Sequence, residues 1–224
     1  MRIILGAALA ALWIGGAAAQ TPVAVVEDVT GNPAGVEFMD YVAAGKIIRL
    51  GPKDAVVLGY MKSCWRETIT GGTITVGEEQ SAVSDGRVQR EKVGCDGGKM
   101  QLTQAQASKS GAMVFRAPPR PAGAPPPVQL TLYGLSPVVE VKGGGKLLIE
   151  RLDQAGERHE VTIGGQQLLR GSFYDFAKAE KSLVAGGLYR ASVGEQQIVF
   201  KVDPYARPGQ APVIGRLLRF VPAS

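Results

Sequence analysis

Residues 45–77 read GKIIRLGPKDAVVLGYMKSCWRETITGGTITVG, and this stretch decides which fold the sequence predicts. In GTITVG, apolar Ile74 and Val76 alternate with Thr73 and Thr75, which is typical of a strand with one buried face. Glycine, proline, aspartate or serine separates most of the short runs, and such regular breaks are typical of all-β domains. We therefore expect a series of short strands here.

The same pattern continues on both sides of this stretch. Short runs such as VAVVEDVT, QSAVS, RVQREKV, KLLIERL and LYRASVGEQQIVFKVD are rich in β-branched residues. Asp85-Gly86 and Gly194-Glu195 are residue pairs that favour tight hairpin turns. The chain holds 30 glycines and 14 prolines among 224 residues, a high content for a helical protein. The sequence predicts an all-β protein.

A proline-rich segment divides the chain. Residues 117–127 read APPRPAGAPPP and hold six of the 14 prolines. Proline fixes φ and donates no main-chain hydrogen bond, so we expect an extended, semi-rigid linker between two small β-domains, 20–116 and 128–224. The alternative is a long proline-rich loop inside one domain, which is uncommon in compact domains.

The first residues have the three-part layout of a secretory signal peptide. In MRIILGAALAALWIGGAAAQ, Arg2 precedes an apolar run, and Ala17 and Ala19 form the small-residue cleavage pattern. The apolar run is shorter than the roughly 20 residues of a membrane span, although an uncleaved anchor remains an alternative. We expect residues 1–19 to be removed, leaving a periplasmic or secreted protein with no integral membrane span.

The chain has two cysteines, Cys64 and Cys95. Disulfides form and persist outside the cytoplasm, so we expect these two to pair. Closing a loop of this length stabilises a fold by about 3.5 kcal/mol in the chain-entropy model. A structural zinc site requires four ligands, and the two cysteines and the single histidine, His159, are too few. We expect neither a metal nor another cofactor.

Candidate binding residues lie in two places. Trp65, Arg66 and Glu67 follow Cys64 directly, and Trp and Arg are the residue types that dominate interface hot spots. Trp65 could stack on a sugar ring; the alternative is that Trp65 fills the domain core.

The second place is the end of the chain. The formal net charge is +5, and Arg207, Arg216 and Arg219 follow the last acid, Asp203. Such a basic segment could meet an anionic lipid, an anionic glycan or an acidic protein, and the alternative is a solvated strand edge. We expect no nucleic-acid partner, because no basic block with interleaved aromatic residues occurs.

The residue types of common catalytic sites are missing. His159 is the one histidine, and it lies beside Glu160 on an expected strand, where a lone histidine is usually structural. Neither a G-x-S-x-G nor an H-E-x-x-H motif occurs in the chain. We therefore expect a protein that is not an enzyme.

Two segments resemble known families. VEDVTGNPAGVEFMDYVAAGKIIRLGPKDAVVLGYM, residues 26–61, resembles the periplasmic FecR-type sensor domain, and the likeness extends over about residues 23–90. Its usual "dGs" turn is replaced by MKSC, so the resemblance implies the fold more than the signalling role. LVAGGLYRA resembles the tyrosine corner of immunoglobulin-like β-sandwiches, with Tyr189 as the corner residue.

These observations favour an exported, non-enzymatic envelope protein that acts as a protein-binding or sensing module. Its partner would be an envelope protein or a cell-envelope polymer. The alternative function is binding of glycan or peptidoglycan, with Trp65 beside the basic segment.

Overall fold

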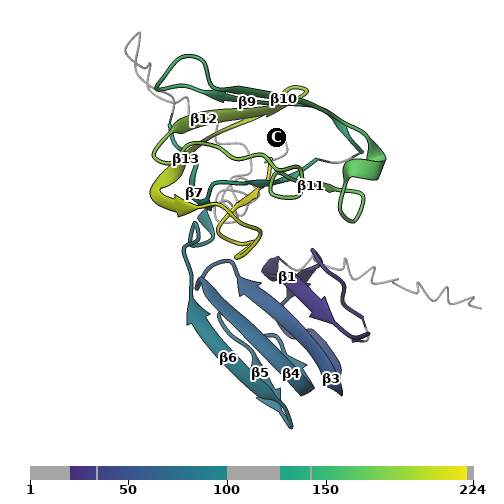
Figure 1. Cartoon of the computed structure of the whole chain (residues 1–224). Helices are drawn as coiled ribbons and strands as arrows, with labels where there is room; N and C mark the ends of the chain where they lie inside the picture. Colours follow the sequence, from purple (N-terminus) through teal and green to yellow (C-terminus); the bar gives the residue numbers. More distant parts are fainter. Residues whose placement is uncertain (1–20, 34, 100–126, 142, 221–224) are drawn as a thin grey trace, which may run out of the picture.

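The computed structural model describes residues 21–33, 35–99, 127–141 and 143–220. The expected signal peptide lies outside these residues, as does the expected linker apart from Pro127. The described part is built from strands with one short 3-10 turn, Gly165–Gln167, which confirms the all-β fold. No helix in this part is long and apolar enough to cross a membrane. Figure 1 shows the strands in two groups, which we name the N-terminal unit (21–99) and the C-terminal unit (127–220).

The N-terminal unit is a six-stranded sheet of order β2-β1-β3-β4-β5, with β6 also paired to β4. Its strands are β1 (Pro22–Thr30), β2 (Tyr41–Ala43), β3 (Ile47–Tyr60), β4 (Trp65–Thr75), β5 (Ala82–Ser84) and β6 (Arg87–Lys92). The alternating apolar residues of β3 and β4 lie on one face. Residues from both ends of these strands, such as Ile48 and Ile74 with Leu58 and Ile69, share a single core.

The two longest strands of this sheet, β3 and β4, lose their regular pairing near the middle of β3. β3 is one continuous strand across Gly51 and Pro52, and its pairing with β4 shifts between Leu50 and Ala55. The opposing residues of β4 are Gly71 and Gly72, which adopt φ of 65° and 80°, conformations that favour glycine.

The prediction of a hairpin at Asp85-Gly86 is wrong. Ser84 pairs with Thr73 and Arg87 with Thr70, so β5 and β6 run in one direction along the same edge of β4. Asp85-Gly86 interrupts the ladder without reversing the chain. Asp85 adopts φ of 57°, a left-handed conformation, and here it serves a bulge.

The C-terminal unit packs two sheets face to face. The larger has the order β10-β9-β12-β13-β7 and the smaller β11-β8-β14. The strands are β7 (Leu130–Gly134), β8 (Val138–Glu140), β9 (Gly145–Arg151), β10 (Arg158–Ile163), β11 (Phe173–Asp175), β12 (Leu188–Val193), β13 (Gln196–Arg207) and β14 (Leu217–Leu218). Their inner faces share one core, in which Ile149 and Phe200 of the larger sheet meet Val139 and Tyr174 of the smaller. The expected hairpin at Gly194-Glu195 is confirmed, because Val193 pairs with Gln196.

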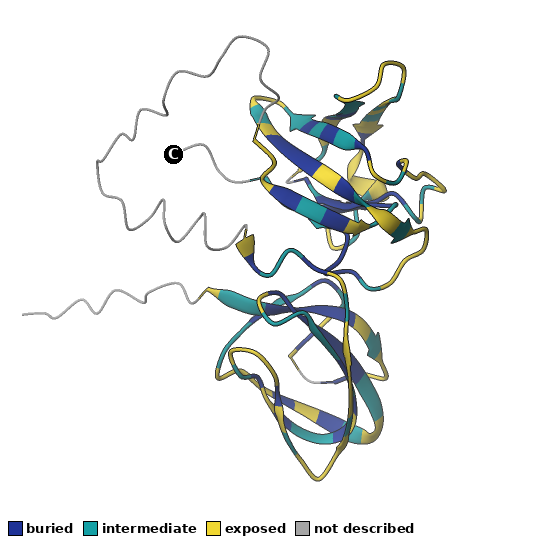
Figure 2. Cartoon of the chain, turned by 90° about the vertical axis from the view of Figure 1, so that its left-hand side faces the viewer, coloured by how far each residue is buried: buried dark blue, intermediate teal, exposed yellow. Residues whose placement is uncertain are grey.

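A third cluster of buried side chains joins the two units. The N-terminal unit contributes Val25, Met39, Met61 and Cys95, and the C-terminal unit Val138, Phe173, Val213 and Ile214. Figure 2 shows buried positions along the strands of both units and in the segments between them. Glycine permits the close approach: a Cβ on Gly215 would lie 2.6 Å from the carbonyl oxygen of Gly94.

Candidate functional site at the disulfide-anchored sheet edge

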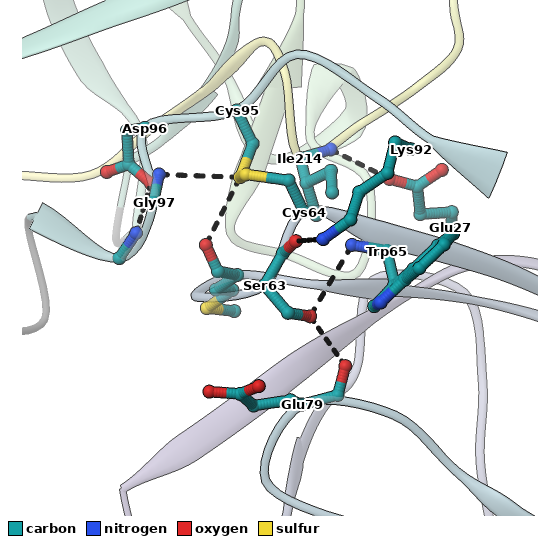
Figure 3. The surroundings of a disulfide bond; sticks show 12 residues. Glu27, Ser63, Cys64, Trp65, Glu79, Lys92, Cys95, Asp96, Gly97 and Ile214 are labelled. Atoms are coloured by element: carbon teal, nitrogen blue, oxygen red, sulfur yellow. Dashed lines mark hydrogen bonds between the residues drawn. A yellow bond between two sulfur atoms is a disulfide. The ribbon is translucent and has the colours of Figure 1, made fainter.

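The predicted disulfide between Cys64 and Cys95 is present, with the two Cα atoms 5.6 Å apart. Cys64 lies in the turn between β3 and β4 and adopts φ of 55°. Cys95 follows β6 by three residues, so the disulfide joins the start of β4 to the segment that leaves β6 (Figure 3). The bond therefore anchors the last strand of the sheet at one end.

That last strand, β6, has an open edge. Among the described residues it pairs with β4 alone, and five of its six residues are exposed. Val93 donates a hydrogen bond to the carbonyl oxygen of Cys64 at 3.0 Å. Because main-chain groups of an antiparallel strand face its partner at alternate residues, those of Val88, Arg90 and Lys92 face away from β4. Within the described residues, no other strand pairs with these groups.

The charged side chains of β6 are held within its own sheet. The Arg90 guanidinium donates to Glu67 at 2.6 Å and to the carbonyl oxygen of Ser81 at 2.8 Å. Glu91 accepts a hydrogen bond from Arg66 at 2.8 Å. Lysines and arginines often guard a sheet edge against pairing, but Arg90 and Lys92 are engaged by groups of the same sheet.

Trp65, the first residue of β4, is half-buried and packs against the N-terminal core. The Lys92 ammonium lies 4.4 Å from the centre of its ring and also donates to the carbonyl oxygen of Ser63. One ring face is therefore occupied by a cation from β6. The arrangement stabilises the end of β6 next to the disulfide.

Glu67 is fully buried and is not part of an exposed surface. Its carboxylate accepts hydrogen bonds from the Ser81 N–H, at 3.1 and 3.2 Å, and from Arg90. The hydroxyl groups of Ser81 and Tyr60 lie 2.7 Å apart, and burial raises the pKa of Tyr60 to about 12. Glu67 thus fastens β6 and the segment before β5 to β4.

Arg66 connects this edge to the C-terminal unit. It donates to the Glu27 carboxylate at 2.8 Å, and Glu27 accepts a second hydrogen bond from the Ile214 N–H at 2.8 Å. Glu27 is 5% exposed, and its burial raises the pKa of this carboxyl above the ordinary value of 4.5. Figure 3 shows the Ile214–Glu27 bond in the surroundings of the disulfide. One buried carboxylate therefore bridges the two units.

The three late arginines do not form one exposed basic surface. Arg216 is 2% exposed, and both ends of its guanidinium bind Asp175, at 2.7 and 3.1 Å. Arg219 binds Glu140 at 2.8 Å and lies over the ring of Tyr41. Arg207 alone is exposed, at the end of β13. Two of the three therefore serve packing within and between the units, Arg216 through the buried carboxylate of Asp175 and Arg219 through the partly exposed carboxylate of Glu140.

His159 lies on β10, as expected, and borders the core of the C-terminal unit. Its ring meets that of Phe176 edge-on, and Nε2 lies 3.5 Å from a carboxylate oxygen of Glu157. The other oxygen of Glu157 accepts the Tyr189 hydroxyl at 2.8 Å and Arg151 at 3.2 Å. Among the described residues, no three His, Cys, Asp or Glu side chains gather in a way that could hold a metal ion.

Comparison with known proteins adds no relative. No family model matches the chain, and neither a curated protein nor a solved structure matches it.

Sequence reasoning placed Trp65 and Arg66 correctly beside the disulfide but missed both the open edge of β6 and the role of Glu27. The signal for the edge was present in RVQREK, where charged residues dominate a short strand, as they commonly do at sheet edges. No comparable signal marks Glu27, because its partner Ile214 lies 187 positions away.

Proposed function

We propose that this chain is an exported, non-enzymatic envelope protein that binds another protein by accepting an extended segment at the edge of β6. The observation that carries the proposal is the open edge of β6, which is exposed and pairs with β4 alone in the described residues. An extended segment that adds to such an edge gains main-chain hydrogen bonds, and adjacent side-chain sites give it specificity.

Preorganisation of β6 supports this function. The strand is tied at its end by the Cys64–Cys95 disulfide and along its length by the contacts Arg90–Glu67 and Lys92–Trp65. A partner that docks on a rigid edge does not have to order it, so less binding free energy is lost. The same contacts hold the side chains of Arg90 and Lys92 against their own sheet.

The two family resemblances are compatible with a binding module. The Tyr189 hydroxyl, which donates to Glu157, accepts a hydrogen bond from the Val184 N–H at 2.9 Å, a bond to the main chain a few residues upstream as expected of an immunoglobulin-like corner. The two packed sheets of the C-terminal unit agree with that resemblance. We propose that the N-terminal unit is FecR-like and carries the binding edge, and that the C-terminal unit, which follows it in the chain, is immunoglobulin-like.

Glycan binding receives less support from the geometry. Sugar rings stack on an open aromatic face, and the ring of Trp65 is half-buried with Lys92 over it. Two of the three late arginines are engaged by carboxylates. We therefore favour a protein partner.

The proposal is tested by crosslinking in cells that express the full chain. A photoreactive amino acid replaces Gln89, an exposed residue of β6, and in a matched control it replaces Thr162, an exposed residue of the edge strand β10. We expect a crosslinked envelope protein from position 89 and none from position 162. Val88→Pro removes a main-chain N–H that faces away from β4, a change that edge strands tolerate, and it should abolish the crosslink.

The same experiment can refute the proposal. A crosslink that persists at full strength in the Val88→Pro variant, or that forms equally from position 162, would show that the β6 edge is not the binding strand. A urea unfolding midpoint of the Val88→Pro protein close to that of wild type would confirm that the variant folds.

A further inference from the structure

A cleft of about 560 Å³ lies at the end of β6 where the chain enters that strand. It is formed where three neighbouring strands lose their regular pairing at one level: β3 after Leu50, β4 at Gly71-Gly72, and the β5–β6 edge at Asp85-Gly86. Its volume lies within the range of sites that hold small ligands or single side chains.

Main-chain groups without partners line this cleft. Asp85 and Gly86 belong to neither ladder of β4, and no main-chain hydrogen bond joins either residue to another described residue. Asp85 also adopts φ of 57°, a conformation uncommon for residues other than glycine, which recurs where ligands are held. The cleft therefore offers both N–H donors and carbonyl acceptors at its wall.

The side chains of the cleft add one charge of each sign. Asp85 and Arg87 both line it, so their formal charges cancel, and Thr70 adds a hydroxyl group. Leu50 and Pro52 supply an apolar part of the wall. A charged guest would meet a like charge as well as an opposite one. A neutral group that both donates and accepts hydrogen bonds, carried on a short aliphatic stem, satisfies the whole lining.

Arg87 belongs both to this cleft and to β6, as the first residue of the strand. A segment that pairs with β6 therefore passes the cleft and can place one side chain in it. We propose that this cleft is the specificity pocket of the β6 site and takes a primary-amide side chain, Asn or Gln, of the bound segment. The inference rests on the proposed function of the β6 edge. A sugar also donates and accepts hydrogen bonds, but none of the residues that line the cleft is aromatic.

A displayed library of random linear peptides, selected against the full-length protein, tests the pocket separately from the edge. We expect bound peptides to share an Asn or Gln at one position and to lose binding to the Val88→Pro variant. Replacing that amide residue with Leu or Glu should weaken binding about ten-fold, the value of one well-placed hydrogen-bonded group.

Variants of the cleft give the matching half of the test. Arg87→Ala and Asp85→Asn, the latter because asparagine tolerates positive φ, should each weaken the amide peptide about ten-fold and leave the Leu peptide unchanged. Arg207→Ala makes the same charge change at an exposed residue of the C-terminal unit and should have no effect.

The outcomes distinguish the two proposals. Peptides that need an intact β6 edge but bind the Arg87→Ala and Asp85→Asn variants as tightly as wild type overturn the pocket and leave the edge. Enrichment of charged or aromatic residues in place of the amide, or displacement of the peptide by soluble cell-wall glycan fragments, overturns the assigned guest. If no peptide binds, or if binding ignores Val88→Pro, the edge fails and the pocket with it.

Discussion

The two units hold their outer strands by different means. The N-terminal unit uses a covalent bond, Cys64–Cys95, which joins the start of β4 to the end of β6. The C-terminal unit uses a buried ion pair, in which Arg216 binds Asp175 of β11 and the carbonyl oxygen of Ser136. A disulfide acts mainly by restricting the unfolded chain, whereas a buried ion pair requires both partners to stay in place. The first unit should therefore tolerate local changes around its tie better than the second.

Breaking the ion pair should have the largest effect. Arg216→Ala leaves the Asp175 carboxylate buried without its partner, and we expect the free energy of unfolding to fall by about 3–5 kcal/mol. Equilibrium unfolding in urea measures the loss. Arg219→Ala is the control, because its pair with Glu140 is partly exposed and should contribute less than about 1 kcal/mol. Equal losses from the two variants would contradict the contrast between the units.

Removing the disulfide should have the next largest effect. Cys64→Ser with Cys95→Ser opens a loop with a sequence separation of 31, and the chain-entropy model gives a loss of about 3.5 kcal/mol. Reduction of the wild-type protein should reproduce this loss in urea unfolding, while reductant should not affect the double variant. If neither the double substitution nor reduction of the wild-type protein lowered the free energy of unfolding, the disulfide would not stabilise this unit.

A change at the junction tests whether the units act together. Gly59→Ala would place a Cβ 2.5 Å from both a Glu27 carboxylate oxygen and a side-chain carbon of Ile214. Such overpacking should cost about 1–3 kcal/mol in thermal or urea unfolding. Gly165→Ala adds a methyl group where nothing lies within 4 Å and serves as control. A Gly59→Ala protein as stable as this control would show that Glu27 and Ile214 can shift to accommodate the added methyl group without loss of stability.

Two buried tyrosines offer a smaller, matched comparison. Tyr189→Phe removes hydroxyl bonds to Val184 and Glu157 in the C-terminal unit, and Tyr60→Phe removes the contact with Ser81 in the N-terminal unit. We expect losses of about 1 kcal/mol for Tyr60→Phe and somewhat more for Tyr189→Phe, because the latter leaves more polar groups unsatisfied. The reverse order in urea unfolding would be inconsistent with these bonds.

The subtlest effect is a pH dependence at Glu27. Burial raises the pKa of this carboxyl in the folded protein above 4.5, so the folded state holds the proton more tightly. The stabilisation is fully present below a pH of about 4.5 and is lost as the pH rises through the folded pKa. The difference in unfolding free energy between wild type and Glu27→Gln should therefore fall with rising pH across this window. A constant difference would contradict the raised pKa.

The sequence predicted those features that depend on local pattern. Alternation in GTITVG and the breaks at glycine led to the all-β fold, and Cys64 and Cys95 led to the disulfide. Asp85-Gly86 was misassigned because an Asp-Gly pair suits a bulge as well as a hairpin, and only the pairing of β4 with both β5 and β6 distinguishes the two. The burial of Arg216 depends on Asp175, which the fold brings near from another strand.

The candidate site shows the same division. A charged strand such as RVQREK can be recognised in the sequence, but its open side follows from which strands lie beside it. Likewise, Glu67 stands next to Arg66 in the chain and points to the opposite face of β4, where Arg90 and Ser81 bury it. The position of Glu67 close to Trp65 in the sequence therefore did not predict that Glu67 is buried.

The contact between Glu27 and Ile214 has a consequence for how the molecule matures. It links the first strand to a segment near the last one, across 187 positions, so it forms only when nearly the whole polypeptide has been made. A chain clipped before residue 213 would still contain both cysteines but would lack the Ile214 N–H that binds Glu27 and two residues of the cluster that joins the units, Val213 and Ile214. Loss of the C-terminal segment would therefore be felt at the junction between the units, where Glu27 would lose the Ile214 N–H, and not at the disulfide.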